Sequence, residues 1–124
     1  MPSARRIPVR ISERAWKADL ASATAAAAEA ARAARRRYTR GGVPLTELHA
    51  CDAEGRDGTR LPDSVKVYLP PPAGAFGMVF QFRKDGDALV LMFLAFGVRH
   101  HPRGAHAATV YERAHQRLHG QPPR

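Results

Sequence analysis

The stretch FGMVFQFRKDGDALVLMFLAFGV, residues 76–98, decides the fold. The residues from Phe76 to Arg83 alternate in character, as do side chains that point to opposite faces of a strand. Asp85-Gly86 is a strong signal for a tight hairpin turn. The run from Ala88 to Val98 is apolar on both faces, which is typical of a central strand that is buried on both sides. The stretch therefore predicts two antiparallel strands joined by a short turn.

A third strand precedes this hairpin, and another strand opens the chain. Val65 to Leu69 alternates in the same way, and the segment PPPAG at 70–74 separates it from the hairpin. Ile7 to Ile11 also alternates, but Pro8 cannot donate a backbone hydrogen bond and suits only a sheet edge or a strand start. Three consecutive antiparallel strands and an N-terminal strand are predicted.

The segment after the first strand has a helical pattern. Ser12 is a good N-cap, and the Ala-, Arg- and Glu-rich residues that follow it continue to Thr39, before Gly41-Gly42 ends the helix. Ser22 and Thr24 favour caps and turns, so one long helix and a helical hairpin both remain open. The apolar stripe of this segment is mostly alanine, which fits close packing on a sheet. It consists of Trp16, Leu20, Ala23, Ala27, Ala31, Ala34 and Tyr38.

The rest of the chain completes an α+β fold. Residues 42–62 are polar and Gly-rich, so we expect a surface loop with at most a short strand or helical turn and little chemistry. A C-terminal helix is expected from about Ala107 to His119, where apolar residues recur at four-residue spacing. Together the elements predict a curved antiparallel sheet with the N-terminal helical segment packed on one face. We expect a single domain over 1–124, with frayed tails at 1–5 and 120–124.

The charge of the chain indicates a polyanionic partner. Twenty Lys and Arg residues against eleven Asp and Glu give a formal net charge of +9, which attracts nucleic acid through counterion release and long-range steering. A proteome in which GC-rich codons raise the content of alanine and arginine would give the same number of basic residues. The single cysteine, Cys51, excludes an intramolecular disulfide and a cysteine zinc site. No secretory signal or membrane span is recognisable, so a cytoplasmic protein is expected.

Four short motifs follow one another in the second half of the chain. They are LPDSVKVYL at 61–69, FGMVFQF at 76–82, LAFGVR at 94–99 and VYERAHQRL at 110–118. In this order they resemble the motifs of the RelE/ParE toxin superfamily, and they are closest to those of RelE-like mRNA interferases. The resemblance covers residues 61–119 by motif and the N-terminal strand and helices by architecture. The His-rich segment between Arg99 and Tyr111 is longer than is usual there.

The resemblance implies the toxin of a type II toxin–antitoxin pair, neutralised by a cognate antitoxin protein that wraps it. RelE-like members cut messenger RNA on the ribosome, whereas ParE-like members inhibit DNA gyrase, and one fold serves both functions. A ribosome-dependent mRNA endoribonuclease without a cofactor is the first expectation. A gyrase inhibitor, or a catalytically inactive relative that binds RNA or a protein, remains an alternative.

The resemblance also implies a set of site residues. Lys66 and Arg99 would hold and stabilise the phosphate, and Tyr111 would stack on or orient the nucleotide. RNA cleavage further requires proton transfer at the 2′-hydroxyl and at the leaving oxygen. His100 and His101 directly follow Arg99 and titrate near neutrality, so either is a candidate general acid or base.

Two departures from the family pattern weaken the ribonuclease assignment. Tyr68 stands where the family has a second lysine, and Gly77 stands where it has an arginine on the third strand. One well-placed donor is worth roughly 3 kcal/mol of transition-state stabilisation. A gyrase inhibitor needs no catalytic set and would tolerate both changes.

Five further arginines could follow a phosphate backbone, although a solvated basic face explains them equally well. They are Arg35, Arg36, Arg37, Arg113 and Arg117. No metal site is predicted, because His100, His101 and His106 lie in a Pro- and Gly-containing loop without helical spacing or an accompanying carboxylate.

Overall fold

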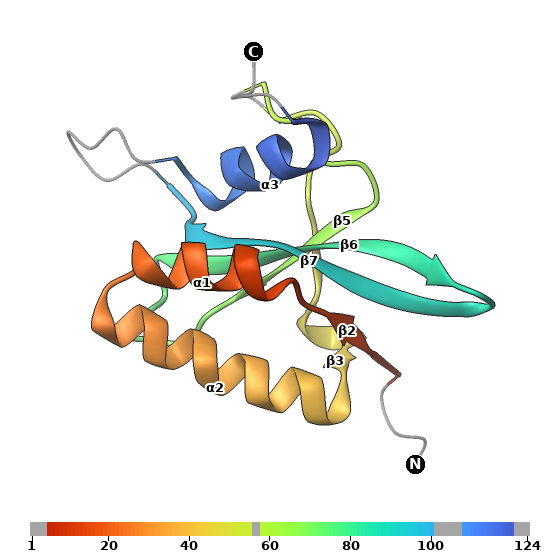
Figure 1. Cartoon of the computed structure of the whole chain (residues 1–124), viewed down its shortest axis with the longest axis horizontal. Coiled ribbons are helices and arrows are strands. Elements are labelled where there is room, and N and C mark those ends of the chain that lie inside the picture. The colour runs from red at the N-terminus through yellow and green to blue at the C-terminus, as the bar shows by residue number, and fades with distance from the viewer. Residues whose placement is uncertain (1–4, 56–57, 101–107, 121–124) are drawn as a thin grey trace.

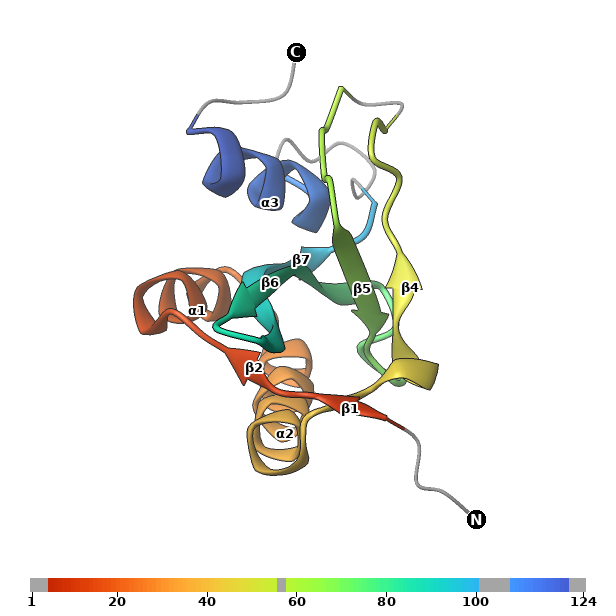
Figure 2. The same ribbon diagram turned by 90° about the vertical axis from the view of Figure 1, so that its right-hand side faces the viewer.

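A five-stranded sheet with the order β2-β7-β6-β5-β4 forms the centre of the protein. The computed structural model describes residues 5–55, 58–100 and 108–120 (Figure 1). Helix α2 lies on one side of the sheet and α3 on the other, while α1 lies beside β7 at the sheet's edge (Figure 2). The predicted α+β class is confirmed. The elements are β1 (Arg6–Ile7), β2 (Val9–Arg10), α1 (Glu13–Ala21), α2 (Ala25–Gly41), β3 (Val43–Pro44), a 3-10 turn η1 (Leu45–Glu47), β4 (His49–Ala50), β5 (Ser64–Tyr68), β6 (Phe76–Asp85), β7 (Ala88–Val98) and α3 (Val110–His119).

The long hairpin forms as predicted. Strands β6 and β7 pair antiparallel from Phe76↔Val98 to Asp85↔Ala88, and Gly86 in the turn has a positive φ of 63°. Strand β5 pairs antiparallel with the other side of β6. The three consecutive antiparallel strands are therefore confirmed, and β7 lies inside the sheet between β6 and β2.

The N-terminal strand differs from the prediction in two ways. It is divided at Pro8 into β1, which pairs antiparallel with β3, and β2, which pairs parallel with β7 at the edge of the sheet. Pro8 has no N–H, but its carbonyl accepts a hydrogen bond from the Leu91 amide at 2.8 Å. The sheet is therefore mixed, and the prediction of a purely antiparallel sheet is wrong. A two-residue strand carries no local pattern that reveals the direction of its partner.

The N-terminal helical segment is a hairpin, which decides between the two alternatives left open by the sequence. The Ser12 side chain caps α1 by accepting from the Ala15 amide, and the Thr24 side chain caps α2 by accepting from the Ala27 amide. Ser22 is the C-cap of α1. Both hydroxyl residues named in the sequence analysis thus sit at the break between the helices, where such residues are favoured.

The main core lies between the sheet and the N-terminal helices. Alanines 27, 31 and 34 of the predicted stripe are buried, and they bring α2 close to a sheet face that carries Phe80 and Phe93. A second, smaller cluster beneath α3 joins Val110 and Ala114 to Val79 and Ala95 on the opposite face. The sheet is thus buried on both faces along the central part of β6 and β7, which fixes the orientation of the side chains there.

Helix α3 begins with a capping box. Thr109 is the N-cap, its hydroxyl accepts from the Glu112 amide, and the Glu112 carboxylate accepts from the Thr109 amide. The predicted start at Ala107 and most of the predicted frayed tails lie outside the described residues. None of the helices in the described ranges has the length and hydropathy needed to cross a membrane.

Candidate functional site

One face of the sheet, on the side of α3, gathers the polar residues that the sequence analysis singled out. His49 on β4 is paired with Lys66 on β5, and Tyr68 is paired with Gly77 on β6. Gly77 is in turn paired with Gly97, two residues before Arg99. Because side chains alternate along a strand, Lys66 and Tyr68 share this face.

The face forms the floor of an open cavity of about 360 Å³. The N-terminal turn of α3 and residues from 51–55 and 59–61 complete its walls. The lining residues are Cys51, Asp52, Gly55, Thr59, Leu61, Lys66, Arg99, His100, Thr109 and Tyr111. The structure therefore brings together four of the five candidate catalytic residues, while His101 lies outside the described residues.

Lys66 is held among aromatic rings. Its Nζ lies 5.0 Å from the ring centroid of Tyr111 and 5.8 Å from that of Tyr68, both within the range of cation–π attraction. Burial lowers the pKa of Lys66, but its interactions with Tyr111, Tyr68 and Cys51 raise it by more, so the net shift is upward. The amine is therefore protonated at neutral pH and suits anion binding rather than a general base.

Arg99 lies across the same face. Its Nε and Nη2 donate to the carbonyl of Gly74 at 3.2 and 2.7 Å, and its Cζ lies 4.5 Å from the ring centroid of Tyr68. The backbone amide of Arg99 also donates to the Ala75 carbonyl at 2.8 Å. The segment 70–75 thus holds the arginine from one side and the aromatic ring holds it from another.

His100 lines the cavity and is exposed. The histidine loop considered for a metal falls mainly outside the described residues, since His101 and His106 are among those whose positions the structure does not describe. Within the described ranges, no group of three His, Cys, Asp or Glu side chains is arranged to hold a metal ion.

Residues 42–62 were expected to form a surface loop with little chemistry, and five of them, Cys51, Asp52, Gly55, Thr59 and Leu61, line the cavity. Burial raises the pKa of the Cys51 thiol to about 11, so this cysteine is protonated at neutral pH and is no nucleophile. Asp52 adds a carboxylate to the wall. No motif marks these residues in the sequence, and only the pairing of β4 with β5 brings the segment against Lys66.

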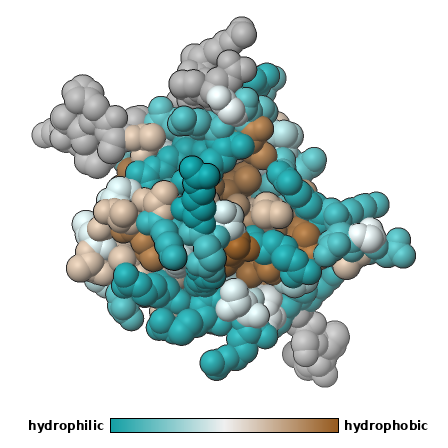
Figure 3. Space-filling view, viewed as in Figure 1, coloured by the Kyte–Doolittle hydropathy of each residue, from teal (hydrophilic) through white to brown (hydrophobic). Residues whose placement is uncertain are grey.

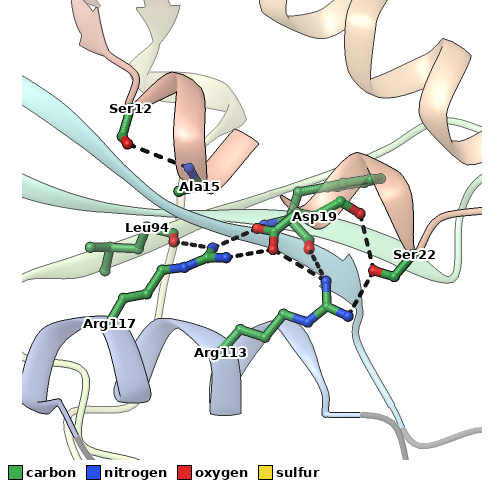
Figure 4. A network of polar contacts seen from close by, with 8 residues as sticks. Ser12, Ala15, Asp19, Ser22, Leu94, Arg113 and Arg117 are labelled. Atoms are coloured by element: carbon green, nitrogen blue, oxygen red, sulfur yellow. Dashed lines mark hydrogen bonds and ion pairs between the residues drawn. The ribbon is translucent and has the colours of Figure 1, made fainter. Parts of the chain in front are cut away.

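Arg113 and Arg117 bind a carboxylate instead of facing solvent (Figure 4). The Asp19 side chain is 2% exposed, and its oxygens lie 3.3 Å from Nη1 of Arg113 and 2.6 Å from Nη1 of Arg117. The carboxylate also accepts from the Phe96 amide at 2.8 Å, and Arg117 donates to the Leu94 carbonyl at 2.7 Å. We call Asp19, Arg113 and Arg117 the Asp19 clamp. It gives both arginines a structural role that the sequence analysis missed.

The arginines of α2 divide into two kinds. Arg35 forms an ion pair with Glu13, and its Cζ lies 5.0 Å from the ring centroid of Trp16. Arg36 and Arg37 also contact carboxylates, those of Glu29 at 3.8 Å and Glu47 at 3.4 Å, but their side chains remain 63% and 58% exposed. Together with Arg6 and Arg40 they line a hollow on the side of the sheet opposite α3. Figure 3 shows hydrophilic residues over much of the face that is seen in Figure 1.

Comparisons with known proteins give a likeness at low identity. No family model matches the chain. No curated protein matches its sequence either. Among solved structures, the chain is similar to a double mutant of the Escherichia coli toxin RelE in the free state, with a TM-score of 0.49 and 18% identity. The match covers 92% of this chain and 99% of the RelE chain.

Proposed function

We propose that the protein is the toxin of a toxin–antitoxin pair and that it cleaves messenger RNA on the ribosome. One observation carries the proposal: Lys66, Arg99 and Tyr111, which come from three separate motifs, line one open cavity. Two cations beside an aromatic ring suit a nucleotide, because the charges bind its phosphate and the ring can stack on its base.

The residues support a division of the chemistry. Lys66 and Arg99 are both cationic at neutral pH and stabilise the charge that develops on the phosphate during attack by the 2′-hydroxyl. His100 is the candidate for proton transfer, because it borders the same cavity and histidine titrates near neutral pH. Tyr111 orients the nucleotide and holds Lys66 in place through its ring. No cofactor enters this scheme.

The exposed arginines of α2 support a second contact with RNA. Arg36 and Arg37, with Arg6 and Arg40, form a positive hollow on the far side of the sheet from the cavity. Such a surface contacts phosphates without reading sequence and strengthens binding to a large RNA such as the ribosome. We do not extend this role to Arg113 and Arg117, whose guanidinium groups bind Asp19.

Induced expression in a bacterium tests the proposal, with transcripts mapped for new 5′ ends and plasmid supercoiling followed in parallel. We expect cuts confined to translated messages, abolished by Arg99→Ala and retained by the matched control Arg83→Ala, whose arginine is exposed near the far end of the hairpin. Relaxed plasmid with intact messages would instead establish the gyrase inhibitor. Growth with neither effect would contradict both toxin activities and leave a binding protein.

A further inference from the structure

Gly77 leaves a bare strip on the sheet face over which Arg99 lies. A Cβ atom built at Gly77 would lie 3.3 and 3.4 Å from Cγ and Cδ of Arg99, and 3.0 Å from the carbonyl oxygen of Val67. Contacts of this length are tighter than ordinary van der Waals contacts, and the carbonyl belongs to the backbone of a paired strand. Any side chain at position 77 would therefore push the arginine away from the sheet.

Tyr68 receives the arginine at the other end of this strip. The ring is 42% exposed, which is unusual for a large aromatic residue beside a cavity. Arg99 Cζ lies 4.5 Å from its centroid, and the His49 ring stacks on it at 4.6 Å with an interplanar angle of 26°. His49 reaches Tyr68 from the β4 side of β5, and Arg99 reaches it from the β6 side.

The hydrogen bonds of Arg99 leave one edge of its guanidinium for a ligand. Nε and Nη2 both donate to the Gly74 carbonyl, so the plane of the group is fixed at that edge. The contact of Cζ with the face of the Tyr68 ring restrains the group from a second side. Among the described residues Nη1 has no hydrogen-bond acceptor, and the side chain borders the cavity.

We infer that Tyr68 and Gly77 are positioning residues that hold the Arg99 guanidinium in the orientation that binds an anionic oxygen in the cavity. Gly77 provides the space, and the Tyr68 ring provides the surface on which the guanidinium rests. The identity of the anion as an RNA phosphate rests on the proposed function, whereas the positioning itself rests on the geometry alone. The ring matters here and the phenol hydroxyl does not, because the contact is with the ring face.

Nitrogen NMR of the Arg99 Nε–H group tests this inference without any activity assay. In the full chain, the heteronuclear NOE of this group should be as high as that of the backbone. Tyr68→Ala and Gly77→Ala should lower it to the value of an exposed arginine such as Arg14, whereas Tyr68→Phe should retain it. Inorganic phosphate, titrated in the same samples, should bind at least tenfold more weakly to the first two variants.

The two alanine variants differ in how far they can disturb the strand pairing itself. Gly77→Ala can disturb β5 through the Val67 carbonyl, so a normal backbone spectrum is required before its result counts. Tyr68→Ala leaves the strand pairing intact and is decisive alone. An unchanged Nε–H order parameter and unchanged phosphate affinity in Tyr68→Ala would overturn the inference. If wild-type protein orders Arg99 through Tyr68 but cuts no message in cells, the proposed function fails and the positioning stands.

Discussion

Two pairs of cationic side chains lie over the sheet, and their partners differ. Arg113 and Arg117 bind the buried carboxylate of Asp19. Lys66 and Arg99 contact aromatic rings, and Arg99 also contacts a backbone carbonyl. A cation whose charge is neutralised by an internal carboxylate stabilises the fold. A cation that contacts an aromatic ring instead keeps its charge available to bind an anionic ligand. Residue type alone therefore does not distinguish a structural arginine from a binding arginine.

Removing the carboxylate of the clamp should have the largest effect on stability. Asp19→Ala leaves two arginines and the Phe96 amide without their acceptor, and breaking a buried pair in this way costs about 3–5 kcal/mol. We expect this loss in the free energy of unfolding by urea. The control is Asp85→Ala, since Asp85 is 66% exposed in its ion pair with Arg10 and should cost at most about 1 kcal/mol. Equal losses in both variants would contradict the structural role of the clamp.

Removing a cation of the cavity should affect activity and leave stability nearly unchanged. Lys66→Met keeps the aliphatic stem but removes the charge, and we expect cleavage to fall roughly a hundredfold. The unfolding free energy should change by less than about 1 kcal/mol. Lys84→Met, at an exposed position near the end of β6, is the matched control for loss of one lysine. A large loss of stability in Lys66→Met would place Lys66 with the structural cations.

A more conservative change sharpens the comparison within the clamp. Arg117→Lys retains the charge, but an ammonium group cannot reach both Asp19 oxygens and the Leu94 carbonyl as the planar guanidinium does. We expect a loss of about 1–2 kcal/mol in thermal or urea unfolding. Wild-type stability in this variant would show that the positive charge alone, and not the planar geometry of the guanidinium, holds the clamp together.

The pH dependence of anion binding should report the protonation state of the Lys66 amine. Its pKa is raised in the folded protein, so the protonated form is favoured and its contribution is complete below the ordinary lysine pKa of about 10.4. The contribution is lost only as the pH rises beyond that value. The affinity for sulfate, whose own charge does not change in this range, gives the contribution of Lys66 as wild type minus Lys66→Met, and this contribution should stay constant from pH 7 to about 10. A decline that begins near pH 8 would contradict the raised pKa.

The arginines of α2 should give the smallest effect. Arg36→Ala combined with Arg37→Ala removes two exposed charges, and for single-stranded RNA the slope of log affinity against log salt should become shallower by about 1.4. Cleavage under saturating substrate should be unaffected. The control Arg113→Ala should change the slope little, because that guanidinium is bound to Asp19. An equal change in both would place Arg113 on the RNA surface.

The sequence predicts those features that depend on neighbouring residues. Asp85-Gly86 marks the hairpin, Ser12 marks the start of α1, and the alanine stripe marks the buried face of α2. Three of the short motifs contain Lys66, Arg99 and Tyr111, which line one cavity. For the hairpin, the cap and the stripe, the determining pattern lies within a short stretch of sequence, where turn, cap and periodicity rules apply.

The features that escape prediction depend on contacts between distant segments. Asp19 meets Arg117 across 98 positions, and β2 meets β7 across more than 80, so no local pattern encodes either contact. Tyr68 and Gly77 are recognisable in the sequence only as departures from a family pattern. The structure shows that they face each other across β5 and β6, with Arg99 lying over both. Two apparent losses are thus parts of one arrangement.

The Asp19 clamp has a further consequence for how the sheet can grow. Strand β2 covers β7 only at Leu91 and Met92, so the following residues would otherwise present unpaired backbone groups along an open edge. The clamp occupies the Leu94 carbonyl and both backbone groups of Phe96. A strand from another chain could add there only by breaking two buried ion pairs. The protein therefore resists edge-to-edge polymerisation along this part of β7.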